Sequence, residues 1–299
     1  MPKFHFIVNP IAGTGRSDRL FNEAKAILDD RGVEYSVAYS EYPTHAVELA
    51  KAAAKNGETH IVAVGGDGTI SEVSKSLVGV EGVTMGVFPF GTGNDLARAL
   101  NIPSEAEGAV DVLLNGEVRS MDMGSANGAM FANVGGFGFD TDVVIYTEKF
   151  KKRFNGMLPY MLGVMQSLLH LKPIKMHINA DGEEFDEEAL LFAAANGTHY
   201  GGGMNVAPLA DPFDGSFDVC IVKKIGALTL LTVLPAFIKG KHLKNKHIRY
   251  MKAKSVKIDC VSGVQLNLDG ELGSVTPVTF SILENAIKII VPKKAESYA

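Results

Sequence analysis

The sequence predicts an α/β + β fold in two domains: an N-terminal doubly wound parallel sheet over residues 1–118 and a C-terminal antiparallel β-sandwich over residues 119–299. The first observation behind this prediction is the length, because 299 residues exceed what one average hydrophobic core holds. The second is that strand-like and helix-like segments alternate as far as about residue 100. The third is that short alternating apolar runs separated by turn signals follow after about residue 118. The extreme C-terminus is expected to pack back on the first domain.

The composition is that of an ordinary globular protein, with 46% hydrophobic and 21% charged residues. A net charge of −5 argues against nucleic acid as a partner. Cys220 and Cys260 lie in strand-like runs, where buried small side chains are expected rather than a disulfide or a metal pair. The N-terminus lacks a secretory signal, and no apolar run reaches about 18 residues. The prediction is a cytoplasmic protein whose membrane contact is at most peripheral.

In the first domain, residues 3–8 are expected to form a strand that runs into a loop of Asn9, Pro10, Ile11, Ala12 and Gly13. A helix is predicted from an N-cap at Ser17 to residue 31, because apolar residues recur at helical spacing. Strands at 33–39, 59–64 and 84–88 alternate with helices at 44–56, 70–78 and 94–100. This alternation favours a parallel sheet whose ligand lies beyond the carboxyl ends of the strands. The first loop matches neither a Walker A motif nor a dinucleotide fingerprint.

Two glycine-rich turns between residues 60 and 95 are the centre of the domain. Each follows an apolar run and exposes an acid: Gly65-Gly66-Asp67-Gly68-Thr69 and Gly91-Thr92-Gly93-Asn94-Asp95. Glycine backbone lets several N–H groups converge on an oxyanion, which favours phosphate binding. Asp67 and Asp95 then suit a divalent cation, ribose hydroxyls or ordered water. The alternative is that both acids only cap the helices that follow.

The second domain is predicted from short alternating runs, with a hairpin turn at Asp181-Gly182. The predicted strands are residues 130–134, 175–180, 190–195, 217–222, 255–260, 264–268, 278–283 and 287–291.

Two helices are predicted within this domain. Residues 157–171 carry Met157, Met161 and Met165 at a spacing of four, which indicates either core packing or a pocket for flexible apolar ligands. Residues 227–238 are almost wholly apolar and precede six cations with no acid between them: Lys239, Lys241, Lys244, Lys246, Arg249 and Lys252. That composition is typical of a segment resting on an anionic bilayer. A buried helix followed by a solvated basic loop is the alternative.

Two acidic turns complete the candidate chemistry. Asp269-Gly270-Glu271 is first a hairpin turn, yet Glu271 would project from it and could deprotonate an attacking hydroxyl. The run from Asp211 through Asp214 to Gly215 is a turn by default and a weak candidate for a cation site.

Taken together, the loop at Asn9–Gly13, the two glycine turns and the late Asp-Gly-Glu resemble the soluble bacterial diacylglycerol kinases and related lipid kinases, cousins of the sphingosine and ceramide kinases. The match covers nearly the whole chain. GGDGT alone is shared with NAD kinases and phosphofructokinases, whereas its combination with GTGND and the late DGE is much more specific. The resemblance implies an N-terminal nucleotide domain and a C-terminal β-sandwich, with ATP and a lipid in the cleft between them.

The resemblance also implies roles for individual residues. Asp67 and Asp95 would organise the phosphates and Mg²⁺, and Glu271 would be the general base on the lipid hydroxyl. A structural Mg²⁺ would be bound by Asp214 with help from Asp211 and Ser216. The positions implied for ATP are Asn9, Pro10, Ile11, Ala12, Gly13, Ser40, Gly66, Asp67, Gly68, Thr69, Ile70, Ser71, Glu72, Thr92 and Asn94.

The chain departs from the family pattern at one position, since several relatives have a lysine after the first glycine loop where this chain has Thr14-Gly15-Arg16. Arg16 is the candidate to substitute for that lysine, and the sequence leaves open whether it does. Gly201-Gly202-Gly203 fits a loop near the lipid entrance and has no other explanation in the sequence.

The predicted function is therefore an ATP- and Mg²⁺-dependent lipid kinase that converts diacylglycerol to phosphatidic acid at an anionic membrane surface, with residues 149–153 and 227–252 making the reversible contact. The alternatives are another lipid alcohol such as phosphatidylglycerol or a sphingosine-like lipid, a soluble-substrate kinase such as an NAD kinase, and a non-catalytic nucleotide-binding protein. The intact acids Asp67, Asp95 and Glu271 argue against lost catalysis. A homodimer is expected by analogy only.

Overall fold

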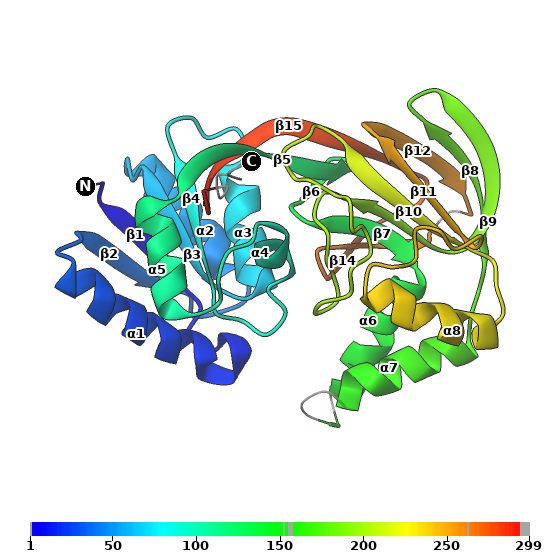
Figure 1. The fold of residues 1–299 in the computed structure, drawn as a ribbon, viewed down its shortest axis with the longest axis horizontal. Helices are drawn as coiled ribbons and strands as arrows, with labels where there is room; N and C mark the ends of the chain where they lie inside the picture. The colour runs from blue at the N-terminus through cyan, green and yellow to red at the C-terminus, as the bar shows by residue number, and fades with distance from the viewer. Residues whose placement is uncertain (1, 152, 155–157, 262, 294–299) are drawn as a thin grey trace, which may run out of the picture.

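The structure is a computed structural model that describes residues 2–151, 153–154, 158–261 and 263–293. The chain forms two parts placed side by side along its longest axis (Figure 1). The N-terminal part comprises residues 4–115 and the C-terminal part comprises residues 117–291.

The N-terminal part is a parallel sheet in the order β2-β1-β3-β4, with helices on both faces. Side chains of α1 and α5 pack in a hydrophobic cluster on one face, and those of α2, α3 and α4 pack in a cluster on the other. The elements are β1 (Phe4–Val8), a short 3-10 turn η1 (Ala12–Gly15), α1 (Arg16–Asp30), β2 (Tyr35–Tyr39), α2 (His45–Lys55), β3 (His60–Gly65), α3 (Asp67–Leu77), β4 (Thr84–Pro89), α4 (Asp95–Ala99) and α5 (Ala106–Asn115).

The helix starts differ from the sequence-based expectation in two places. Gly15, with φ of 86°, precedes the first residue of α1, so Ser17 lies buried inside the first turn and is not the N-cap. α3 begins at Asp67, three residues before the predicted start at residue 70, so Asp67 belongs to the first turn of a helix. Helix α5 was not predicted from the sequence.

The C-terminal part contains antiparallel strands packed around a second hydrophobic core, as the sequence predicted. The Asp181-Gly182 hairpin is confirmed: both residues have positive φ and connect β8 to β9. The strands are β5 (Glu117–Ala126), β6 (Ala129–Phe131), β7 (Val134–Gly138), β8 (Ile174–Ala180), β9 (Glu183–Ala195), β10 (Phe217–Lys223), β11 (Ile248–Ala253), β12 (Ser255–Cys260), β13 (Gln265–Leu268), β14 (Glu271–Val275) and β15 (Val278–Val291). The helices are α6 (Phe139–Lys151), α7 (Leu158–Leu169) and α8 (Ala227–Ile238).

Several boundaries in this part were predicted wrongly. The predicted strand 130–134 is divided between β6 and β7, and α6 was missed. The two strands predicted at 278–283 and 287–291 are one strand, β15, whose pairing with β5 is irregular between Leu283 and Ile287. β11 occupies the end of the basic segment between residues 239 and 252, where no strand was predicted.

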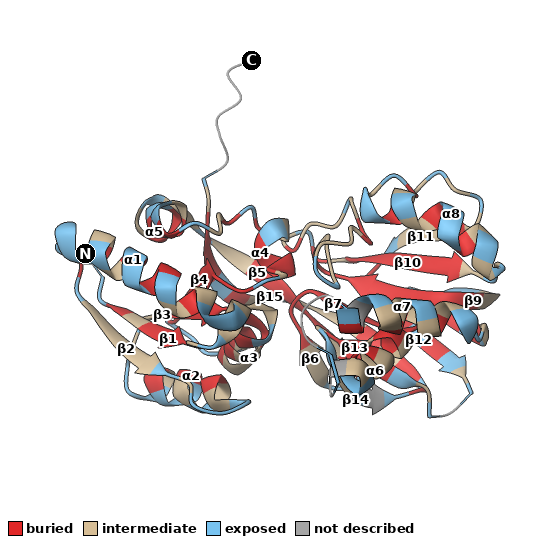
Figure 2. Ribbon diagram, turned by 90° about the horizontal axis from the view of Figure 1, so that it is seen from below, coloured by how far each residue is buried: buried red, intermediate tan, exposed pale blue. Residues whose placement is uncertain are grey.

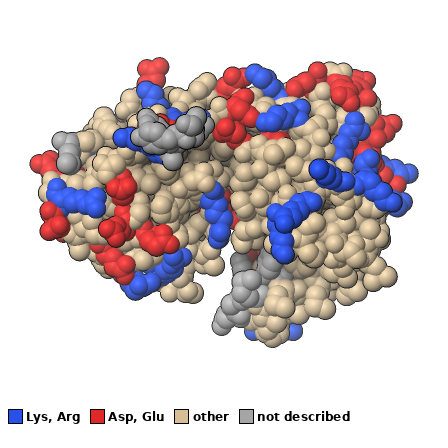
Figure 3. Space-filling view, viewed as in Figure 1, with Lys and Arg blue, Asp and Glu red and all other residues tan. Residues whose placement is uncertain are grey.

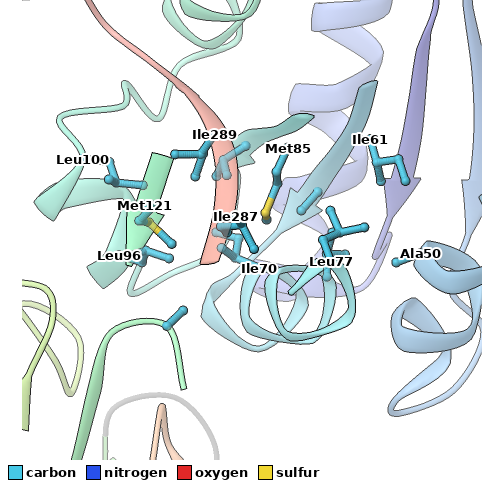
Figure 4. Packing of buried hydrophobic residues seen from close by; sticks show 14 of the residues in the cluster. Ala50, Ile61, Ile70, Leu77, Met85, Leu96, Leu100, Met121, Ile287 and Ile289 are labelled. Carbon is cyan, nitrogen blue, oxygen red and sulfur yellow. The ribbon is translucent and has the colours of Figure 1, made fainter. Parts of the chain in front are cut away.

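Strands β5 and β15 join the two parts. β15 pairs with β12 near its start and, in parallel, with β4 near its end, where Lys288 faces Thr84. Met121 of β5 and Ile289 of β15 therefore reach into the core that also contains Met85 (Figure 4). The two parts share one continuous sheet, while the division between residues 118 and 119 stays a prediction.

The outer faces of α7 and α8 are apolar. Met161 and Met165 are 59% and 60% exposed, so they do not pack in a core. Met157 lies outside the described residues. On α8, Leu230, Val233 and Phe237 are buried, whereas Leu228, Leu231 and Ile238 face outward. Figure 2 shows exposed residues along the outer sides of both helices. In the described part of the chain, neither these nor any other helix has both the length and the apolar character needed to cross a bilayer.

Candidate active site

Three loops meet at the carboxyl ends of β1, β3 and β4. Gly66 and Gly91 touch through their backbones: a Cβ atom added to Gly91 would lie 2.2 Å from the Cα of Gly66. The Gly91 N–H donates to the carbonyl of Gly65 (3.0 Å), and the Asn9 amide donates to Thr69 Oγ1 (3.2 Å). Glycine is required at position 91, because a side chain there would have no room beside the backbone of Gly66.

Asn94 closes the third loop. It has a left-handed backbone with φ of 56°, and its Nδ2 donates to the carbonyls of Pro89 (2.7 Å) and Gly91 (3.2 Å). Its Oδ1 is buried and has no hydrogen-bond partner among the described residues. Asn tolerates the left-handed conformation better than most residues, so one side chain fixes the turn and presents a free acceptor.

The Asp67 carboxylate binds the backbone of the neighbouring loop. Asn94 N–H donates to Oδ2 (2.7 Å) and Asp95 N–H donates to Oδ1 (2.6 Å). Burial and the nearby Asp95 charge together raise the pKa of Asp67 to about 6, although the two amide donors oppose this shift. Asp67 therefore holds the β3 and β4 loops together while its charge is only partly compensated.

Asp95 is linked to the C-terminal part of the molecule. The Gly202 N–H donates to Asp95 Oδ2 (2.8 Å), whereas Oδ1 is buried with no partner among the residues that the structure describes. Burial raises the pKa of Asp95, and the Gly202 hydrogen bond opposes the change. Gly201, Gly202 and Gly203 all have positive φ, so the glycine run that the sequence left unexplained brings a backbone donor to this acid.

The Asp-Gly-Glu turn lies on the opposite side of the site, between β13 and β14. Asp269 accepts hydrogen bonds from the N–H groups of Ala132 (2.7 Å), Asn133 (2.9 Å) and Val134 (3.1 Å). It also accepts one from Ser71 Oγ on α3 (2.9 Å). This carboxylate therefore fixes the turn to both parts of the molecule.

Glu271, the predicted general base, extends from this turn toward α3. Lys75 Nζ lies 3.1 Å from Glu271 Oε2, and the Glu271 side chain is 57% exposed. Both acids of the turn thus contact residues of α3, the helix that starts at the Asp67 loop.

A buried acid supports the turn from behind. Asp140 Oδ2 accepts a hydrogen bond from Asn267 Nδ2 (3.1 Å), and Asn267 Oδ1 accepts one from the Gly270 N–H (2.9 Å). Burial raises the pKa of Asp140 to about 6, and the Asn267 hydrogen bond opposes this change. Asp140 therefore orients Asn267, which in turn fixes the backbone beside Glu271.

The other positions implied for the nucleotide fall into two groups. Ser40 donates its N–H to Val8 O (2.8 Å), Gly68 lies in the first turn of α3, and the remaining positions lie in the connections at this edge of the sheet: Pro10, Ile11, Ala12, Gly13 and Thr92. The side chains of the second group point elsewhere: Ile70 lies in the core, Ser71 binds Asp269, and Glu72 Oε1 accepts the Thr44 N–H (3.3 Å). This second group can contact a ligand only through backbone or after rearrangement.

Arg16 would need a free guanidinium to contact phosphates in place of the lysine of several relatives, but its guanidinium is engaged by backbone carbonyls. Its guanidinium donates to the carbonyls of Gly91 (3.0 Å) and Ser104 (3.3 Å). It therefore ties the first loop to the third, and its role in this structure is to support the loop backbone.

The residues predicted for a structural cation form a separate cluster beside β10. Asp214 Oδ1 accepts hydrogen bonds from the N–H (3.1 Å) and Oγ (2.8 Å) of Ser216, while Asp211 Oδ1 accepts the Phe213 N–H (3.2 Å). The ammonium of Lys252 contacts Asp214 and lies 3.2 Å from Asp218. No group of three or more His, Cys, Asp or Glu side chains with suitable geometry for a metal occurs within the described ranges. In this arrangement Lys252 supplies the cation for Asp214, and the metal site stays a prediction.

Lys252 also corrects the expectation of six unpaired cations after α8. Arg249 pairs with Glu183 (3.2 Å), so two of the six have acidic partners on other strands. Lys239, Lys241, Lys244 and Lys246 are exposed and have no ion pair within the part of the chain that is described. Figure 3 shows Lys and Arg side chains gathered over the C-terminal part, and a notch between the two parts at the lower edge of this face.

Residues 3–126 match the family model of the diacylglycerol kinase catalytic domain, and residues 133–291 match that of the YegS C-terminal NAD kinase beta sandwich-like domain. The chain is 36% identical to a diacylglycerol kinase of Bacillus subtilis (strain 168), over 99% of both sequences. It is 33% identical to one of Staphylococcus epidermidis (strain ATCC 12228 / FDA PCI 1200), over 96% of this chain and 91% of that protein. A crystal structure of a diacylglycerol kinase from Bacillus anthracis str. Sterne aligns with a TM-score of 0.77 at 26% identity, covering 97% of each chain.

These matches extend over both parts of the chain and agree with the glycine loops and the late Asp-Gly-Glu turn. The chain therefore belongs to the diacylglycerol kinase family and is a lipid kinase.

Proposed function

We propose that this lipid kinase transfers the γ-phosphate of ATP to the free hydroxyl of diacylglycerol and releases ADP and phosphatidic acid. The observation that carries the proposal is the contact between α3, the helix that begins at the Asp67 loop, and the Asp-Gly-Glu turn. Two hydrogen bonds make this contact, Ser71–Asp269 (2.9 Å) and Lys75–Glu271 (3.1 Å). A nucleotide on the loops and a hydroxyl at the turn would therefore be neighbours.

The loops offer the chemistry that a triphosphate requires. Gly66, Gly68 and Gly91 leave the backbone open at the helix starts, where N–H groups attract anions. Asp67 and Asp95 would repel phosphate directly, so a cation must lie between these acids and the phosphates. The orphaned, buried Oδ1 atoms of Asn94 and Asp95 fit this requirement, because hard oxygen acceptors suit Mg²⁺ and its water ligands. Bound there, Mg²⁺ would neutralise charge on the transferring phosphoryl group.

Glu271 is the residue that we assign to the proton transfer. Its carboxylate accepts the proton of the lipid hydroxyl as the hydroxyl oxygen forms a bond to the γ-phosphorus. The bond between that phosphorus and the oxygen bridging to the β-phosphate breaks, and ADP leaves with the electron pair. Asp67 and Asp95 hold the loops in which the phosphates are bound, and the amides of those loops balance the negative charge of the transition state.

The lipid is presented by a bilayer, and α8 with the following lysines is the surface that we assign to this contact. Leu228, Leu231 and Ile238 face outward, with exposed fractions of 82%, 47% and 52%, beside the four lysines that form no ion pair with any described residue. Each lysine contributes about 1 kcal/mol near an anionic leaflet. Replacing Leu228 and Leu231 together by Ser should weaken co-sedimentation with phosphatidylglycerol-containing vesicles. Val261→Ser, which removes an apolar side chain that is 72% exposed elsewhere on the C-terminal part, should leave it unchanged.

The substrate is tested by transfer of labelled γ-phosphate from ATP to mixed micelles, with and without Mg²⁺. Diacylglycerol, phosphatidylglycerol and sphingosine are offered in separate micelles, and NAD is offered in solution. We expect Mg²⁺-dependent label in phosphatidic acid. Label in another lipid would change the substrate assignment, and label only in NAD, or in no acceptor, would contradict the proposal.

A further inference from the structure

Helix α3 contacts both acids of the Asp-Gly-Glu turn from one face. Ser71 and Lys75 are four residues apart, so they lie one above the other on the helix. Ser71 Oγ donates to Asp269 Oδ2 (2.9 Å), and Lys75 Nζ donates to Glu271 Oε2 (3.1 Å). The same helix starts at the Asp67 loop, so it connects the nucleotide side of the site directly to the predicted base.

Lys75 acts on two carboxylates, on Glu271 by direct contact and on Glu72 through its charge. Burial raises the pKa of Glu72, the Thr44 N–H opposes the change, the charge of Glu271 raises the pKa further, and Lys75 lowers it. Glu72 and Glu271 are therefore close enough to repel each other, and the Lys75 ammonium offsets that repulsion. Its side chain is 21% exposed against 57% for Glu271, so the cation is the better-shielded partner of the pair.

The position of Lys75 argues against direct phosphate binding. Eight residues separate it from Asp67 along α3, which at 1.5 Å per residue is a rise of about 12 Å from the start of the helix. A lysine that contacts phosphates from a glycine loop lies close to the N-terminus of the helix instead. What Lys75 does contact is the carboxylate of Glu271.

We propose that Lys75 is a positioning residue for Glu271, an inference that rests on the base role assigned above. By holding Oε2 against α3, Lys75 turns Oε1 toward the place where the lipid hydroxyl enters. Without the ammonium, repulsion from Glu72 pushes the exposed Glu271 side chain away from the turn. Lys75 therefore acts on turnover through Glu271 and does not act on nucleotide affinity.

Four variants test this role: Lys75→Met, Lys75→Arg, Glu271→Gln and the double variant Lys75→Met/Glu271→Gln. Lys51→Met is the matched control, because Lys51 is an exposed lysine of α2 with no ion pair among the described residues. For each variant kcat, the KM values for ATP and for diacylglycerol micelles, and the thermal midpoint are measured.

We expect Lys75→Met to lower kcat between about 10-fold and 100-fold, the range caused by small displacements of a catalytic group. The KM for ATP and the thermal midpoint should stay near those of Lys51→Met. Lys75→Arg should recover most of kcat, since it keeps the charge. In the Glu271→Gln background, Lys75→Met should have almost no further effect, because residues that act as one unit are not additive.

Two results would overturn the proposal. An unchanged kcat in Lys75→Met would remove any role for the contact. An increase in the KM for ATP, together with a further loss in the Glu271→Gln background, would assign Lys75 to the phosphates. Full turnover in Glu271→Gln would refute the base role of Glu271. The two outcomes differ because refuting only the positioning role of Lys75 leaves Glu271→Gln inactive.

Discussion

The two sides of the candidate site hold their acids in different ways. Asp67 is fixed by backbone N–H groups of the adjacent glycine loop, at 2.6 and 2.7 Å, and Asp95 by the Gly202 N–H at 2.8 Å. Glu271 is held through one lysine side chain and is 57% exposed. The acids on the side proposed for the phosphates are therefore held by backbone groups, whereas the position of the proposed base depends on one ion pair between side chains.

The largest effect is expected where the backbone contact itself is broken. Gly91→Ala places a Cβ 2.2 Å from the Gly66 Cα, so the two loops must separate. We expect at least about a 100-fold loss of ATP affinity and about 3 kcal/mol less unfolding free energy, the upper range for overpacking. The measurements are calorimetric titration with ATP and urea unfolding.

Gly66→Ala is the matched control for this substitution. Its added Cβ meets Gly91 Cα at 3.4 Å, and Gly66 has a φ of −97°, which other residues adopt freely. It should lose clearly less stability than Gly91→Ala. Equal destabilisation by both would mean that the loops are not in contact as described.

The next effect concerns the acid that anchors the base side. Asp269→Ala removes the acceptor for three backbone N–H groups and for Ser71. Unfolding free energy should fall by about 2 to 3 kcal/mol, because buried donors are left unpaired. Urea unfolding measures this change, and a loss below about 1 kcal/mol would show that water replaces the carboxylate at little cost.

Asp140 adds a pH dependence to the base side. Its pKa is raised from 3.8 to about 6 by burial, so the folded state binds more protons than the unfolded state between these values. The contribution of Asp140 to stability therefore falls as the pH rises from about 4 to 6 and stays unfavourable above that range. Asp140→Asn removes this cost and keeps an acceptor for Asn267.

Asp140→Asn should consequently be more stable than the parent at pH 7.5 by roughly 1 to 3 kcal/mol, and about equal to it at pH 4. Urea unfolding at the two pH values measures the difference. A variant that is less stable than the parent at pH 7.5 would show that the ionised carboxylate is favourable in its site.

The smallest effect is expected at one of the side-chain links between the two parts, the hydrogen bond from Ser71 to Asp269. Ser71→Ala removes one hydrogen bond to Asp269 while the three backbone donors stay in place. About 1 kcal/mol of unfolding free energy should be lost. Urea unfolding would detect this change, and a loss as large as that of Asp269→Ala would mean that Ser71 carries the anchor by itself.

The sequence predicted those features whose signal is local. Buried apolar strands followed by glycine turns gave the parallel sheet and placed Asp67 and Asp95 at one edge, and the period-two runs gave most of the antiparallel strands. Helix α6 was missed, although it follows directly after Gly138. The methionine spacing of α7 predicts an apolar stripe along one side of the helix, but it does not show whether the stripe faces a core or solvent. Met161 and Met165 are exposed.

The contacts that connect the site could not be predicted in this way. Ser71 and Asp269 are 198 residues apart, and Lys75 and Glu271 are 196 apart, so only the packing of α3 against the β13–β14 turn brings them together. The same is true of Lys252, which pairs with Asp218 because β10 and β11 are neighbours in the sheet. The contact between Gly202 and Asp95 could be predicted in part. Three successive glycines at 201–203 indicated an unusual backbone conformation, but the sequence did not show that Asp95 is the acceptor.

The central claim is that Glu271 serves proton transfer and does not serve nucleotide binding. Its most direct test compares the parent with Glu271→Gln in one preparation, measuring the ATP dissociation constant by calorimetry and labelled phosphate transfer to diacylglycerol micelles. We expect an ATP affinity within about threefold of the parent and a turnover lowered by at least about 100-fold, the range for loss of a general base. Turnover close to that of the parent would contradict the account.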